Sequence, residues 1–150
     1  SLDLASRADP ASLDAEALRW LASRLGGDPA AAARAGGVLS RAGERAAPVL
    51  AAEVPRTSGA GRLRALELLR AVGGEERVDR VAAWAPLLVE EDCELRRAAA
   101  RRLGEIGSTA AVPALQALVG ITRDRPVCGA PEAAAALERI RLAADRRRPW

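Results

Sequence analysis

Residues 93–119 read CELRRAAARRLGEIGSTAAVPALQALV, and this stretch predicts two short amphipathic helices joined by a tight turn. The apolar residues of its first half recur at spacings of four, four and three, so they share one helix face; they are Leu95, Ala99, Leu103 and Ile106. Gly107 then ends this first helix, because glycine accepts the left-handed conformation that a helix end often needs.

The second half of the stretch carries the signals of a new helix. Ser108 or Thr109 can accept orphan backbone N–H bonds as the N-cap, and Pro113 suits the first turn, where a missing N–H costs little. The inner face of this helix is predicted to hold Val112, Leu115, Leu118 and Val119. A helix–turn–helix unit follows.

The unit repeats along the chain. One leucine position recurs at intervals of 30, 34 and 34, in Leu39, Leu69, Leu103 and Leu137. An alanine stands four residues before each, in Ala35, Ala65, Ala99 and Ala133, and a glycine four residues after the first three, in Gly43, Gly73 and Gly107. The fourth copy has Arg141 instead. This period and helix content predict a stacked array of helical repeats.

The pattern resembles the HEAT-repeat family in its short, phycobilisome-lyase-like form. The resemblance is carried by Leu95-Arg-Arg-Ala-Ala-Ala-Arg-Arg-Leu-Gly-Glu-Ile-Gly107 and by Ala111-Val-Pro-Ala-Leu115, and it extends more loosely over residues 28–145. It implies an all-α fold, an α-solenoid of about four stacked hairpins with an N-terminal capping helix. It also implies a scaffold role, in which the second helices line a concave face.

Composition agrees with an all-α fold. Alanine supplies 36 of the 150 residues, and it favours helix and close helix packing. All 23 basic residues are arginine, which we interpret as a mark of GC-rich, bacterial coding. The net charge of +3 is small, so it gives little support for nucleic-acid binding.

Taken in order, the chain predicts a flexible lead-in at 1–12, one repeat domain at 13–145 and a frayed basic tail at 146–150. The expected helices are 13–25 with Ser12 as cap, 29–42 with Asp28 as cap, 45–54, 60–72, 75–89, the pair in 93–119, and 131–144. Pro86 should kink or end its helix near Trp84. The connection at 120–130 is the longest, and long loops are often functional.

Cys93 and Cys128 are too few to suggest a disulfide framework in a domain of this size, and we expect them to be reduced thiols. Their offset of 35 nearly matches the repeat, so they could lie on neighbouring units, and a disulfide between them stays open as the alternative. No apolar run approaches the ~20 residues of a membrane span, and no signal peptide is visible. We expect a cytoplasmic protein. The start at Ser1 leaves open an excised or processed segment.

The residues available for chemistry are limited. The chain has no histidine, which excludes Ser-His-Asp and Cys-His arrangements, and two cysteines cannot make a four-thiolate zinc site. It contains neither a P-loop nor a dinucleotide-binding fingerprint. We interpret the acidic run at 90–92 as complementing a helix dipole rather than binding metal. We therefore expect no enzyme activity, no cofactor and no metal.

The candidate partner-binding residues are Arg77, Arg80, Trp84 and Gln116. The first three share one side of a predicted second helix, and Gln116 holds a comparable place on the next. Tryptophan and arginine are enriched in binding hot spots. Because Trp84 matches Leu118 in register, a core position for Trp84 stays open as the alternative.

These residues give two main functional hypotheses. The first is a non-catalytic scaffold or adaptor that binds a protein with an acidic or apolar surface. The second is a DNA-backbone-binding module, since arginine suits phosphate by its bidentate geometry, although interleaved acids and the lack of aromatic stacking residues oppose it. An accessory role beside a bilin lyase is a third reading, which rests on the repeat subtype alone.

Overall fold

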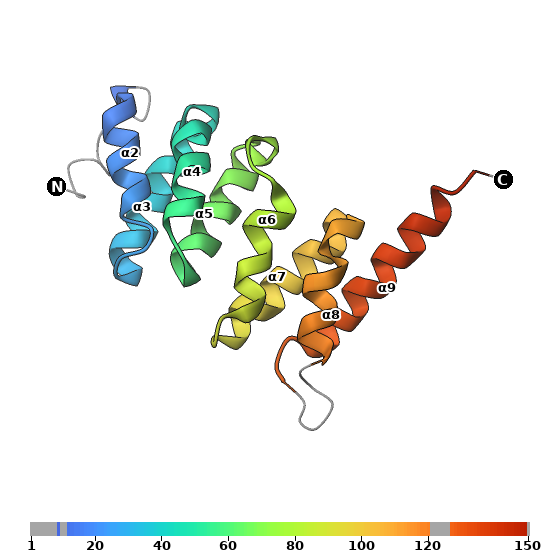
Figure 1. Cartoon of the computed structure of the whole chain (residues 1–150). Helices are drawn as coiled ribbons and strands as arrows, with labels where there is room; N and C mark the ends of the chain where they lie inside the picture. The colour runs from blue at the N-terminus through green and yellow to red at the C-terminus, as the bar shows by residue number, and fades with distance from the viewer. Residues whose placement is uncertain (1–8, 10–11, 121–126, 150) are drawn as a thin grey trace. The chain divides into compact units, whose positions relative to one another are not determined.

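The computed structural model describes residues 9, 12–120 and 127–149, and over these residues it is all-α and holds no strand. Its α-helices follow one another along the chain in Figure 1. They are α2 (Ala15–Ser23), α3 (Pro29–Ala42), α4 (Ala47–Glu53), α5 (Gly59–Ala71), α6 (Arg80–Trp84), α7 (Cys93–Ile106), α8 (Val112–Gly120) and α9 (Ala130–Arg146). Helix–turn–helix units therefore make up the chain, as the repeat pattern predicts.

The chain divides into two compact units, Ser1–Asp79 and Arg80–Trp150. The sequence predicted one domain at 13–145, whose repeats pair 60–72 with 75–89, and the division falls within that pair. In a repeat array each repeat packs mainly on its neighbours, so no single central core holds all the helices together. Such a chain can divide between any two consecutive helices.

In the first unit, α2 packs against α3 and α4, and α5 packs against the same two helices. Its largest fully buried side chains are leucines, namely Leu21, Leu25, Leu39, Leu50, Leu66 and Leu69. The N-terminal helix expected to cover the first repeat is thus α2. Asp14 caps it by accepting a hydrogen bond from the Ala17 amide at 2.8 Å, so the prediction of Ser12 as the cap is wrong.

In the second unit, α7 packs against α9 and against the 3-10 segment η5 (Ala85–Val89), and α8 packs against the same two elements. The core is again aliphatic, with Leu87, Leu88, Leu103, Leu115 and Ile140 fully buried. Pro86 has the effect that the sequence predicts: α6 ends at Trp84, and the backbone continues as η5.

The turn signals of the repeats are confirmed. Gly43, Gly73 and Gly107 have φ angles of 62°, 78° and 73°, the left-handed region that favours glycine. Asp28 caps α3 through the Ala30 and Ala31 amides, and Pro29 is its first residue. The conformational preferences of single residues therefore determine where these helices begin and end.

Two expectations fall partly outside the described residues, the lead-in at 1–12 and the connection at 120–130. Residues 146–149, the described part of the tail, differ from the frayed segment that the sequence predicts. Arg146 belongs to α9, and the Arg147 guanidinium donates a hydrogen bond of 3.2 Å to the carbonyl of Gly107. This contact joins the end of α9 to the end of α7.

The two cysteines form a disulfide, so the expectation of reduced thiols is corrected. Cys93 and Cys128 have Cα atoms 5.5 Å apart, within the usual range for a bridge. Cys93 begins α7 and Cys128 lies just before α9, and the packing of α7 on α9 brings these two positions together. Counting cysteines could not reveal this proximity.

Candidate functional site

The four predicted binding residues are divided between the two compact units. Arg77 ends a 3-10 turn (Glu75–Arg77) of the first unit, whereas Arg80, Trp84 and Gln116 belong to the second. Arg77, Arg80 and Gln116 are exposed. Three of the four side chains are therefore open to a partner.

Trp84 is the exception, and the prediction that it is an exposed binding residue is corrected. Its side chain is 3% exposed and lies in the core of the second unit. The helical register anticipates this position, because Trp84 matches Leu118, which is also buried. Among the described residues, the indole Nε1 finds no hydrogen-bond partner. Trp84 can support a surface from beneath, but it cannot contact a partner directly.

Gln116 borders a groove of about 410 Å³ between α8 and α9. The groove is mostly apolar, and its lining includes Val112, Ala134, Leu137, Ile140 and Ala144. A hydrophobic floor with an exposed amide at its edge is suited to contact with another protein.

Two charged side chains that also line this groove, Glu138 and Arg141, belong to a small ion-pair network on α9. The Arg141 guanidinium donates to both carboxylate oxygens of Glu138, at 2.6 and 3.1 Å, and to Asp145 at 3.1 Å. The hydrogen bond from Arg141 lowers the pKa of the Glu138 carboxyl below its ordinary value, and Glu138 in turn raises the pKa of Arg141. All three side chains are exposed, so the network adds little stability.

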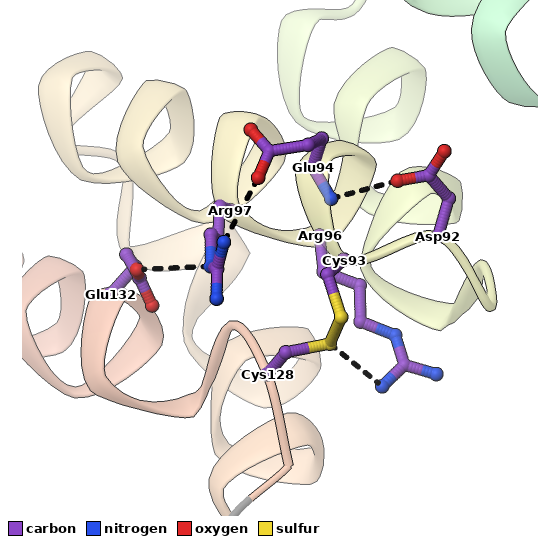
Figure 2. Close-up of polar contacts among 7 residues, drawn as sticks. All are labelled: Asp92, Cys93, Glu94, Arg96, Arg97, Cys128 and Glu132. Atoms are coloured by element: carbon purple, nitrogen blue, oxygen red, sulfur yellow. Dashed lines mark hydrogen bonds and ion pairs between the residues drawn. A yellow bond between two sulfur atoms is a disulfide. The ribbon is translucent and has the colours of Figure 1, made fainter.

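A second polar cluster surrounds the start of α7 (Figure 2). Asp92 accepts a hydrogen bond of 2.8 Å from the Glu94 amide, which confirms that the acidic run caps the helix. Arg97 pairs with Glu94 at 2.9 Å and with Glu132 of α9 at 3.5 Å. Together with the disulfide, these contacts join α7 to the start of α9.

Sequence reasoning missed Arg96, whose guanidinium lies beside the disulfide in Figure 2. Its Nε donates to the Glu90 carbonyl, and one terminal nitrogen lies 3.9 Å from the Cys128 sulfur. In the sequence, Arg96 is one of several arginines on a helix. Only the folded arrangement distinguishes it from them.

Within the described ranges, no group of three or more His, Cys, Asp or Glu residues could hold a metal ion. None of the helices there is long and apolar enough to cross a membrane.

Comparison with known proteins identifies one part of the chain. Residues 95–120, which comprise most of α7 and all of α8, match the model of the PBS lyase HEAT-like repeat. They are a HEAT-like repeat. HEAT-like repeats generally serve as protein-interaction scaffolds and are typically non-catalytic, since stacked repeats provide extended binding surfaces.

The chain is also similar to the serine/threonine-protein kinase pkn2 of Myxococcus xanthus. The two are 31% identical over 90 residues, which cover 57% of this chain and 10% of the kinase. The chain therefore corresponds to about a tenth of that protein's length. No solved structure gives a significant match.

Proposed function

We propose that the chain is a non-catalytic scaffold or adaptor module that binds another protein through the exposed surface of its second helices. The observation that carries the proposal is the placement of Gln116 in the matched HEAT-like repeat, at the edge of the apolar groove between α8 and α9. Arg77 and Arg80 are the further exposed residues in the proposal. A partner with an acidic or apolar surface would complement these features.

The charge distribution favours protein over nucleic acid. Arginines of α7 and α9 are paired with acids, among them Arg97 with Glu94 and Glu132, and Arg102 with Glu105 at 3.0 Å. Phosphate binding requires arginines that can release counterions from the nucleic-acid backbone. Carboxylates that already neutralise these side chains oppose such binding.

The similarity to a bacterial kinase supports a bacterial origin, and we extend the proposal to the cytoplasm. This location has a consequence for Cys93 and Cys128. Disulfides are rare in the cytosol and are mostly catalytic or redox-sensing there. The bridge would then form only under oxidising conditions.

The test begins with capture of partners from the native host and their identification by mass spectrometry. Affinity for each partner is then measured with the double variant Arg80→Ala, Gln116→Ala. We expect affinity to fall at least about tenfold, because hot-spot truncations cost more than about 1 kcal/mol each. Circular dichroism confirms that the variant remains folded.

Arg101→Ala is the matched control, since Arg101 is an exposed arginine on a first helix. It should leave affinity unchanged. Equal affinities for the double variant and the wild type would exclude this surface. Binding of labelled duplex DNA that falls steeply with salt would favour the nucleic-acid alternative instead.

A further inference from the structure

A second pocket, of about 260 Å³, lies on the other side of α8. Its lining includes Leu88 and Val89 of η5, Ala117 and Leu118 of α8, Val127, and Arg96 of α7. Val89 is 79% exposed. The pocket thus combines apolar walls, an exposed valine at one wall and a single guanidinium.

The charge of Arg96 is not neutralised in the part of the chain that the structure describes. The two hydrogen bonds of its guanidinium go to a backbone carbonyl, that of Glu90, and to the Cys128 sulfur. Neither acceptor carries a formal negative charge, and the side chain is partly buried. A guanidinium beside apolar walls gains more from an incoming carboxylate than one in open water.

The wall beside Arg96 is held in place by two features. The disulfide fixes Cys128 to the first residue of α7. Gly129, with φ of 91°, packs closely against the Arg96 stem, since a Cβ at Gly129 would lie 2.9 Å from the Arg96 Cβ and 3.4 Å from Leu118 Cδ2. The guanidinium is therefore positioned before any partner arrives, which lowers the entropy cost of binding.

We propose that this pocket binds an aliphatic side chain of a protein partner whose neighbouring carboxylate pairs with Arg96. Its volume is below the about 300–1,000 Å³ of small-molecule sites, so a side chain suits it better than a whole metabolite. The proposal deepens the proposed function and rests on it for the choice of a protein partner. It uses different residues from those tested above.

The experiment titrates the uniformly ¹⁵N-labelled, oxidised full chain with three short peptides. The probe is acetyl-GSLESG-amide, and the controls replace its glutamate by glutamine or its leucine by alanine. We expect the probe to shift the amide signals of Val89, Ala117 and Leu118 and the Arg96 Nε–H signal. Each control should bind about tenfold more weakly, because it lacks either the charge-assisted bond or the apolar anchor.

Two variants of the chain test the pocket itself. Ala117→Leu fills it from an exposed helix position, and should abolish the shifts without unfolding the chain. Ala135→Leu, at an exposed position of α9, is the matched control and should bind like the wild type. Arg96→Gln should bind the glutamate and glutamine peptides equally, because the charge that distinguishes them is gone.

Several results would overturn the proposal. The first two concern the wild-type chain: no shifts at millimolar probe, or equal affinities for the glutamate and glutamine peptides. The others are unchanged binding of the probe by the Ala117→Leu variant, or tighter binding of decanoate than of the probe at the same residues of the wild type. The variant Arg80→Ala, Gln116→Ala should bind the probe normally. If the probe binds the pocket of that variant and the affinity of the variant for its protein partner is unchanged, this inference stands. The surface around Arg80 and Gln116 is then excluded as the binding site.

Discussion

Helices α7 and α9 occupy the same position in successive repeats, 34 residues apart, yet their surroundings differ. Ala99 and its equivalent Ala133 are both fully buried. One residue further on, Ala100 is fully buried in α7 while Ala134 is exposed in α9. Leu103 is likewise fully buried, and its equivalent Leu137 only partly.

The difference arises from what covers each helix. α9 packs on α7 closely enough that a Cβ at Gly104 would lie 2.9 Å from the Cα and Cβ of Ala136. The equivalent of Gly104 in α9 is Glu138, which is exposed and paired with Arg141. Sequence register thus specifies which face of a helix is apolar, whereas the neighbouring helix determines how much of that face is buried.

The largest expected effect comes from truncating the equivalent leucines. Leu103→Ala should lower the free energy of unfolding by about 3–5 kcal/mol, because it leaves a cavity in a fully buried site. Leu137→Ala should cost about 1 kcal/mol, since its site is partly open. Urea denaturation of both variants measures the difference. Equal losses would show that α9 is as well covered as α7.

Breaking the disulfide removes the covalent tie between the starts of the two helices. Reduction should cost about 2–4 kcal/mol, because the bridge spans 35 residues and restricts the unfolded chain. The comparison is urea denaturation with and without a thiol-free phosphine reductant. The double variant Cys93→Ala, Cys128→Ala should be equally destabilised and insensitive to the reductant. If the reductant leaves the free energy of unfolding of the wild type unchanged, that result would contradict a bridge in solution.

Gly104→Ala tests the close approach of α7 to α9. Alanine is the better helix former by about 1 kcal/mol. The added methyl would meet Ala136, however, so we expect a net loss of about 1–2 kcal/mol in thermal or urea unfolding. Glu138→Ala at the equivalent position should leave stability nearly unchanged, because its side chain is exposed. A stabilised Gly104→Ala variant would mean that the helices lie further apart.

The smallest effect concerns the ion pair between Glu138 and Arg141 of α9. The equivalent positions of α7 are the glycines Gly104 and Gly107. The pKa of Glu138 is lowered by its hydrogen bond to Arg141, so the pair contributes at pH values above the ordinary glutamate pKa. That contribution is lost as pH falls through the lowered folded-state value. Carbon-detected NMR titration of the Glu138 carboxyl should show the shift, and Arg141→Gln should return the pKa toward its ordinary value. An unchanged titration in that variant would assign the shift to another cause.

Much of the fold could be predicted because its signals are local. Gly107 ends α7 through a backbone conformation that glycine tolerates, and Asp28 caps α3 through hydrogen bonds two and three residues away. The fourth copy carries Arg141 where glycine is expected, and α9 correspondingly continues to Arg146. These effects depend on neighbours in the sequence, so they can be read from it.

The candidate site was less predictable because its features depend on distant contacts. The register of Trp84 with Leu118 allowed a buried position, but the packing of α6 and η5 onto α7 decides between burial and exposure. The bridge at Cys128 and the environment of Arg96 likewise require segments more than 30 residues apart to meet. The exposure of Gln116 could be predicted, because it follows from helical periodicity alone.

The bridge between Cys93 and Cys128 also determines how the molecule carries tension. It closes a covalent loop around the hairpin of α7 and α8, so a force applied to the two ends of the chain passes through the sulfur atoms and bypasses that hairpin. An oxidised chain pulled to full extension would be shorter than a reduced one by roughly 110–120 Å, the contour length of the enclosed segment less the Cα separation across the bridge. Oxidation would thus keep the HEAT-like repeat at 95–120 mechanically shielded while the rest of the chain is stretched.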